Sequence, residues 1–176
     1  MKVLVTAFKP FNNMKNNYSQ EVLKYIEDVD KLVVDVVYDQ CYQNIINSFD
    51  LDSYDLIISM GEARMREELT LELSAQNLSS CSLPDNLGNL KKDEEIMPSG
   101  ELILHTKVDL SKVFEEIKFS NDAGKFVCNN LYYHLLANYS TKVLFIHVPE
   151  CHDDEKMYQK LAAKIQKIIK ILGGNK

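Results

Sequence analysis

The sequence predicts a three-layer α/β/α sandwich with a mostly parallel central sheet. Short apolar segments alternate along the chain with segments of helical periodicity. Most of the apolar segments are nearly continuous, as expected for strands that are buried on both faces. The 176 residues contain no internal repeat and no linker. We therefore expect a single domain over residues 1–176.

In the first third of the chain, strands and helices are expected to alternate. Residues 2–6 are apolar and β-branched, which predicts a buried strand, and residues 8–13 contain Pro and paired Asn, which favour a loop. The apolar residues of 19–28 share one face of a predicted helix. The elements predicted next are a strand at 31–38, a helix at 41–49 and a strand at 55–60.

Apolar and polar residues alternate from Leu69 to Leu78. This period of two predicts one half-covered strand, with Glu72 on its polar face, towards a cleft or solvent. Residues 81–100 are rich in turn formers and charge, so we expect an exposed loop or lid there.

The last third of the chain repeats the alternation. We predict strands at 101–105, 118–120 and 142–148, and helices at 110–117, 125–138 and 153–172. The last helix is amphipathic and ends at a Gly-Gly pair. In α/β sheets the loops beyond the carboxyl ends of the strands form the sites. The segments expected to gather there are 8–13, Gly61, 120–128 and His147.

Composition and charge exclude several classes of function. The net charge of −6 and the absence of a basic run argue against nucleic-acid binding. No apolar run approaches the ~18 residues that span a bilayer, so we expect no membrane partner. The histidines form no recognisable ligand motif, so no metal and no cofactor is expected. Four cysteines without paired spacing, and no signal segment, indicate free thiols in the cytoplasm.

One cysteine and one histidine carry the candidate chemistry. Cys128 lies near the start of a predicted helix, where the dipole and unpaired N–H groups favour a thiolate. His147 lies at the end of a predicted strand and could exchange a proton with it. A cysteine on a helix is more often a small buried hydrophobe, so this pair alone does not decide the function.

Five segments, in order, resemble the pyroglutamyl peptidase I (pyrrolidone-carboxylate peptidase) family of cysteine peptidases over nearly the whole chain. They are Val5–Phe11 with Asn17, Leu71-Glu72 with Asn77, Pro84-Asp85-Asn86, Ser120–Asn129, and Phe145–Pro149. The resemblance implies a phosphorylase/hydrolase-like fold and a thiol protease that removes N-terminal 5-oxoproline from peptides. It also implies a homo-oligomer, since members often form dimers or tetramers.

The resemblance assigns roles residue by residue. Glu72 falls on the acid of the family's triad, Cys128 on its nucleophile and His147 on its base. It implies a substrate pocket for a small, flat, uncharged lactam. The residues that match this pocket are Phe8, Phe11, Asn17, Glu62, Phe126 and Val127, with Glu62 meeting the lactam through nearby backbone. Arg66 matches an arginine in the family's Gly-x-Ala-x-x-Arg turn.

Departures from the family pattern keep other functions open. Asn12-Asn13 replace Gly-Gly, and Ser82 replaces an arginine that could stabilise developing negative charge. One alternative is a homologue acting on another small acyl or amide substrate, and a second is a catalytically weak binding protein of the same fold. A nucleoside-phosphorylase-like enzyme is less favoured, because the chain has no Gly-rich phosphate loop.

Overall fold

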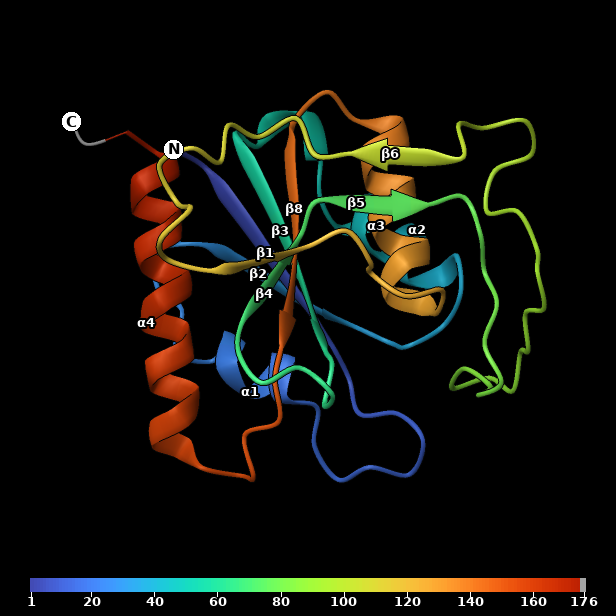
Figure 1. Ribbon diagram of the computed structural model, residues 1–176, viewed down its shortest axis with the longest axis horizontal. Helices are drawn as coiled ribbons and strands as arrows, with labels where there is room; N and C mark the ends of the chain where they lie inside the picture. The colour runs from blue at the N-terminus through green and yellow to red at the C-terminus, as the bar shows by residue number, and fades with distance from the viewer. Residues whose placement is uncertain (175–176) are drawn as a thin grey trace.

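The computed structural model describes residues 1–174, and its centre is a six-stranded sheet (Figure 1). The strands are β1 Val3–Phe8, β2 Asp30–Val34, β3 Leu56–Glu62, β4 Thr70–Glu72, β7 Lys118–Ser120 and β8 Lys142–Val148. Their order across the sheet is β2-β1-β3-β8-β4-β7. The first four run parallel, whereas β4 is antiparallel to β8 and β7 is parallel to β4.

Helices cover both faces of this sheet. One face carries α1 (Tyr18–Leu23) and α4 (Glu155–Leu172), and the other carries α2 (Gln40–Ser48) and α3 (Val127–Asn138) (Figure 1). A one-turn 3-10 helix, η1 (Leu51–Ser53), precedes β3. The predicted α/β/α sandwich with a mostly parallel sheet is therefore confirmed.

A second, two-stranded sheet lies beside α3. It consists of β5 (Ser74–Gln76) and β6 (Ile103–His105), which pair in antiparallel register (Figure 1). The chain between them contains the predicted exposed loop, 81–100, in which no helix and no named strand occurs. This loop is fastened by Asn77, whose Oδ1 accepts the N–H groups of Ile96 and Met97 at 2.9 Å.

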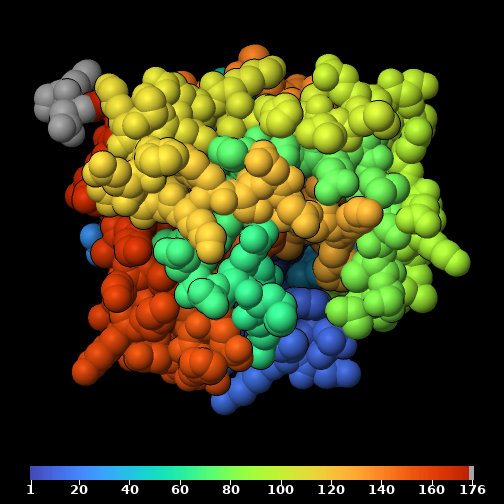
Figure 2. Space-filling view, in the orientation of Figure 1, coloured from blue at the N-terminus to red at the C-terminus, as the bar shows by residue number. Residues whose placement is uncertain are grey.

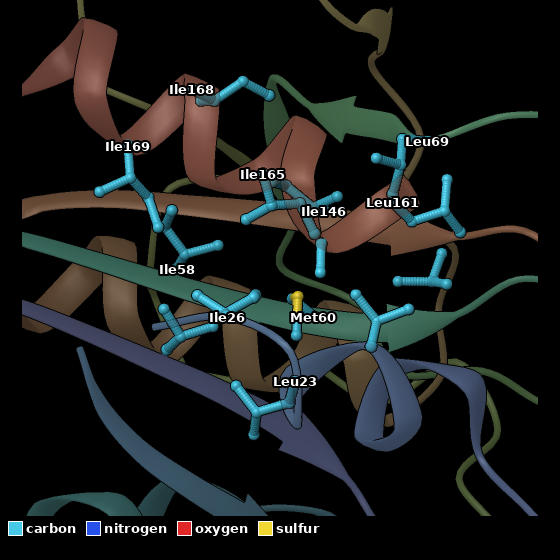
Figure 3. Packing of buried hydrophobic residues seen from close by; sticks show 14 of the residues in the cluster. Leu23, Ile26, Ile58, Met60, Leu69, Ile146, Leu161, Ile165, Ile168 and Ile169 are labelled. Carbon is cyan, nitrogen blue, oxygen red and sulfur yellow. The ribbon is translucent and has the colours of Figure 1, made fainter. Parts of the chain in front are cut away.

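The sheet is held by one apolar cluster on each face. Figure 3 shows the cluster beneath α4, where isoleucines of the helix pack against residues of the strands. Residues of α1 and the segment after it, such as Leu23 and Ile26, belong to the same cluster. The labelled members are Leu23, Ile26, Ile58, Met60, Leu69, Ile146, Leu161, Ile165, Ile168 and Ile169. Each such side chain stabilises the fold by about 1.5–3 kcal/mol on burial. The strands therefore form a rigid support for residues at their carboxyl ends.

The prediction of one half-covered strand over 69–78 was wrong. The chain forms β4 and β5, which belong to different sheets. Because β4 lies between β8 and β7 and is covered on both sides, Thr70, Leu71 and Glu72 are all fully buried. Glu72 therefore faces the protein interior rather than solvent.

The predicted helix over 110–117 was also wrong. Hydrogen bonds there join residues three apart, from Val113 N–H to Leu110 C=O and from Glu116 N–H to Val113 C=O. These are successive turns, and no helix forms in this segment. Val113 and Ile117 are buried, whereas Phe114 between them is exposed. The apolar residues therefore anchor an irregular segment.

Several element boundaries also differ from the predictions. The strand β1 extends to Phe8, so this residue lies in the sheet and not in the loop that follows. The strand β2 ends at Val34, whose C=O accepts the Lys9 N–H at 2.8 Å, rather than continuing to Tyr38. The helix α1 ends at Leu23.

Candidate active site

Cys128 lies in the first turn of α3 and packs directly against Gly61 of β3. A Cβ atom at position 61 would lie 2.6 Å from Cys128 Sγ, closer than such contacts occur, so only glycine leaves room for the thiol. Gly61 is paired with His147 in the β3–β8 register. Residues paired in register project towards the same face of a sheet. Cys128 and the side chain of His147 are thus brought to the same face of the sheet, at adjacent strands.

His147 is hydrogen-bonded to Glu72. The distance from His147 Nδ1 to Glu72 Oε1 is 2.8 Å, and the two side chains are 7% and 0% exposed. Because a carboxylate only accepts, Nδ1 carries the proton and Nε2 is left as an acceptor. The ring of Phe145 packs 5.0 Å from the imidazole, centroid to centroid. The imidazole is therefore fixed in both orientation and tautomer.

Arg66 contacts the same carboxylate oxygen of Glu72 as His147 does. Its Nη2 lies 3.0 Å from Glu72 Oε1, 3.0 Å from Ser120 Oγ and 2.9 Å from the Asp122 C=O. The second carboxylate oxygen, Glu72 Oε2, is buried and has no hydrogen-bond partner within residues 1–174. Arg66 therefore supplies the positive charge next to a fully buried carboxylate.

The surroundings of Cys128 favour the thiol over the thiolate. Burial, followed by the negative charge of Glu72, raises the pKa of Cys128 to about 12, although its own backbone N–H acts in the opposite direction. The expected thiolate-stabilising effect of the helix start is therefore outweighed. A base must take the thiol proton before or during attack.

Aromatic side chains lie beside Cys128. The ring of Phe126 is 5.9 Å from that of Phe11 and meets Tyr38 edge to face at 5.5 Å. Phe8 and Val127 are 2% and 0% exposed, so their side chains belong to the core behind this wall. Figure 2 shows a hollow on this face, bordered by the blue loop after β1, the green β3–β4 loop and the orange segment before α3.

Tyr38 was not singled out from the sequence. Its hydroxyl is buried and has no hydrogen-bond partner in the described part of the chain. Its backbone N–H donates to Asp85 Oδ2 at 3.1 Å, which ties it to the 81–100 loop. The residue falls in an apolar run that reads as strand, so the sequence carries no signal of its place beside Phe126.

Asn17 fastens the loop after β1 rather than standing free for a ligand. Its Oδ1 accepts the Ser19 N–H at 3.1 Å and caps α1, and its Nδ2 donates to the Lys9 C=O at 3.1 Å. The Ser19 hydroxyl in turn accepts the Phe8 N–H at 3.2 Å. This network fixes the loop that carries Phe11.

Glu62 uses both carboxylate oxygens within the protein. Oε2 accepts the Tyr18 N–H at 2.7 Å, and Oε1 is 2.6 Å from Arg64 Nε. Its side chain is only 2% exposed. The backbone around Glu62 is therefore the part that is left to meet a ligand.

The departures from the family pattern lie in two loops, the loop after β1 and the 81–100 loop. Asn12 and Asn13 have φ of 52° and 57°, the left-handed conformation in which glycine is least strained. Ser82 is exposed in the 81–100 loop.

Within residues 1–174, no cluster of three or more His, Cys, Asp or Glu side chains could hold a metal ion. In the same part of the chain, no helix has the length and apolar character to cross a membrane.

Comparisons with known proteins identify the family of the chain. A family model described as pyroglutamyl peptidase matches residues 1–167. The chain is 35% identical over 168 residues to a pyrrolidone-carboxylate peptidase of Thermoanaerobacter sp., covering 85% of this chain and 82% of that protein. It is similar in structure to pyroglutamyl peptidase I of Bacillus amyloliquefaciens, with a TM-score of 0.85, 27% identity and 94% of each chain covered. Pyrrolidone carboxyl peptidase from Pyrococcus furiosus gives a TM-score of 0.84 at 25% identity, with 98% and 100% covered.

Proposed function

Because the chain belongs to the pyroglutamyl peptidase family, we propose that it is a cysteine peptidase which removes N-terminal pyroglutamyl (5-oxoproline) residues from peptides. The observation that carries the proposal is the 2.8 Å hydrogen bond between Glu72 and His147, beside a thiol that packs on Gly61. In this proposal residues 1–176 act as one catalytic domain.

In the first half of the reaction, Cys128 Sγ attacks the carbonyl carbon of the pyroglutamyl residue. His147 Nε2 accepts the thiol proton as the S–C bond forms, and Glu72 stabilises the resulting imidazolium. The N–H groups in the first turn of a helix have no intrahelical partner and can donate to the developing oxyanion. The C–N bond then breaks, and the imidazolium gives its proton to the departing amine.

In the second half, water releases the acyl group. His147 takes a proton from water as its oxygen attacks the thioester carbonyl, and the C–S bond then breaks. The thiolate recovers its proton from the imidazolium, and 5-oxoproline leaves as the free acid.

The aromatic wall accounts for the proposed selectivity. Phe11 and Phe126 remain partly exposed and offer apolar surface to a flat lactam ring. An N-terminal ammonium in the same place would lose its hydration without a partner, which costs several kcal/mol. Phe8 and Val127 support the wall from the core, and Asn17 fixes its loop.

The proposal also includes the cellular localisation and the oligomeric state of the protein. All four cysteines are free, which suits a reducing compartment, and we assign the enzyme to the cytoplasm. We also propose that the protein assembles as a homo-oligomer, either a dimer or a tetramer. Light scattering coupled to size-exclusion chromatography tests the assembly.

The decisive assay is release of a fluorogenic amine from a pyroglutamyl amide. We expect turnover by the full chain and a loss of about ten-thousandfold or more in kcat for Cys128→Ser. Cys81→Ser is the matched control, because Cys81 is also partly buried and its loop position is outside the proposed triad. No release by a well-folded protein would contradict the substrate, and release that survives Cys128→Ser would contradict the nucleophile.

A second candidate is hydrolysis of another small acyl or amide substrate. It is favoured by Ser82, which is exposed where the family pattern has an arginine. The same assay with prolyl, alanyl and acetyl amides separates the two functions. Faster turnover of one of these amides than of the pyroglutamyl amide supports the second candidate.

A further inference from the structure

The Arg66 guanidinium connects three segments that surround the candidate site. Arg66 sits in the turn between β3 and β4, where its N–H donates to the Ala63 C=O at 2.9 Å. The neighbouring Met65 is 96% exposed, whereas the Arg66 side chain turns inward and is 31% exposed. Its Nη2 then reaches Glu72 in β4 and the Ser120–Asp122 segment that leads to α3.

The charged groups around Glu72 show that its contact with Arg66 supplies the positive charge facing this carboxylate. The Glu72 carboxylate has no exposed surface, and its Oε1 is shared by His147 and Arg66. The other titratable groups that act at the site are Cys128 and Tyr132 of α3, and Glu62, which acts on Cys128. None of these three supplies a positive charge. Among these groups, Arg66 is the permanent cation that faces the carboxylate.

We propose that Arg66 is a positioning residue for catalysis: its guanidinium keeps Glu72 as the carboxylate that orients His147, and ties this pair to the segment carrying Cys128. The inference rests on the proposed function, since the Glu72–His147 pair must serve the reaction. It adds a fourth residue to the machinery, one that acts through Glu72 and touches no substrate.

The proposal predicts the pH dependence of the site. A fixed positive charge opposes the uptake of a proton by the Glu72–His147 pair, whichever of the two residues would hold that proton. Removing the charge lets the pair take up a proton at higher pH. Because His147 must be neutral to accept the thiol proton, the acid limb of activity then moves to higher pH.

The test compares substitutions of Arg66 that separate charge from hydrogen bonding. In the full chain, Arg66→Met removes both, Arg66→Gln keeps a donor, and Arg66→Lys keeps the charge. Lys118→Met is the matched control, because Lys118 lies on β7 and its side chain forms an exposed ion pair with Glu68 at 4.0 Å.

Two readouts are measured against pH. The first is kcat/KM for the pyroglutamyl amide. The second is the rate at which iodoacetamide alkylates Cys128, followed on the Cys128 peptide by mass spectrometry, which requires no substrate. We expect both acid limbs to move up by about one pH unit or more in Arg66→Met and Arg66→Gln. Arg66→Lys and Lys118→Met should stay close to the wild type.

The outcomes separate the two proposals. A shifted alkylation profile without pyroglutamyl hydrolysis supports the role of Arg66 and contradicts the proposed substrate. Hydrolysis with unshifted acid limbs in Arg66→Met and Arg66→Gln overturns the role of Arg66. An equal shift in Lys118→Met would also overturn it, since the effect would then be general charge. If Arg66→Met does not fold, the Gln and Lys variants make the same comparison.

Discussion

Gly61 and Cys128 are in contact across the β3–α3 interface, with 2.6 Å between the Cβ position of residue 61 and the thiol sulfur. The thiol therefore occupies space that any other residue at position 61 would fill. The same glycine pairs with His147 in the sheet. One small residue thus fixes how closely the start of α3 approaches the strand that carries the imidazole.

We expect Gly61→Ala to displace Cys128 and to lower kcat by about a hundredfold, because such misplacement of a reacting atom by about 1 Å has an effect of this size. Overpacking should also cost about 1–3 kcal/mol in the free energy of unfolding. Urea unfolding and the fluorogenic assay measure the two effects.

A double-mutant cycle identifies the cause. In a Cys128→Ala background the sulfur is absent, so Gly61→Ala should cost less stability than in the wild type, by about 1 kcal/mol. Equal costs in the two backgrounds would show that the added methyl group meets Phe145, whose Cζ lies 3.0 Å away, rather than the thiol.

The sequence was sufficient where a structural element depends on its own residues. The strands 118–120 and 142–148 have the bounds that their residue patterns predict. The segment from 69 to 78 was misread because its alternation is also compatible with two short strands in separate sheets. Pairing partners, and not local pattern, decide that outcome.

The same distinction between local pattern and pairing in the fold applies to the residues of the candidate site. Residue type and expected position identified Cys128 and His147, whereas Glu72 was assigned only through the family resemblance. Glu72 contacts His147 across a separation of 75 residues in the chain. That contact depends on the register of β4 against β8, which no local pattern encodes. Arg66 and Tyr38 likewise gain their surroundings only in the folded chain.

The Asn12-Asn13 turn offers a test of backbone strain. Both residues have positive φ, which asparagine tolerates and β-branched residues do not. We expect Asn13→Gly to change the free energy of unfolding by less than about 0.5 kcal/mol, because glycine also accepts this conformation. Asn13→Val should cost about 1–2 kcal/mol. Equal stability of the two variants in urea unfolding would contradict the left-handed conformation.

The Asn17 network predicts a loss of both stability and substrate affinity. Asn17→Ala removes the cap of α1 and the bond to the Lys9 C=O, at a cost of about 1–2 kcal/mol. Because the loop carrying Phe11 is then less fixed, KM for the pyroglutamyl amide should rise. Asn16→Ala is the adjacent control, since Asn16 makes an exposed bond, to Asp153 at 2.8 Å. An equal rise of KM in both variants would count against the network.

Because the Cys41 thiol is buried, we expect the free energy of unfolding to fall in alkali, independently of catalysis. Burial raises the pKa of the Cys41 thiol well above its ordinary value of about 8.5. Above that pH the unfolded chain releases the thiol proton whereas the native chain retains it. The unfolded state then binds fewer protons, so the free energy of unfolding falls as pH rises, by up to about 1.4 kcal/mol per pH unit for this group.

Urea unfolding of the wild type and Cys41→Ala between pH 8 and pH 10.5 measures this contribution. The substitution leaves a cavity and lowers stability at pH 8, but that cost does not depend on pH. Above about pH 8.5 the stability of the wild type should therefore fall more steeply than that of Cys41→Ala, and the two curves should converge. Parallel curves over this range would show that the thiol ionises equally well in the folded and unfolded chains.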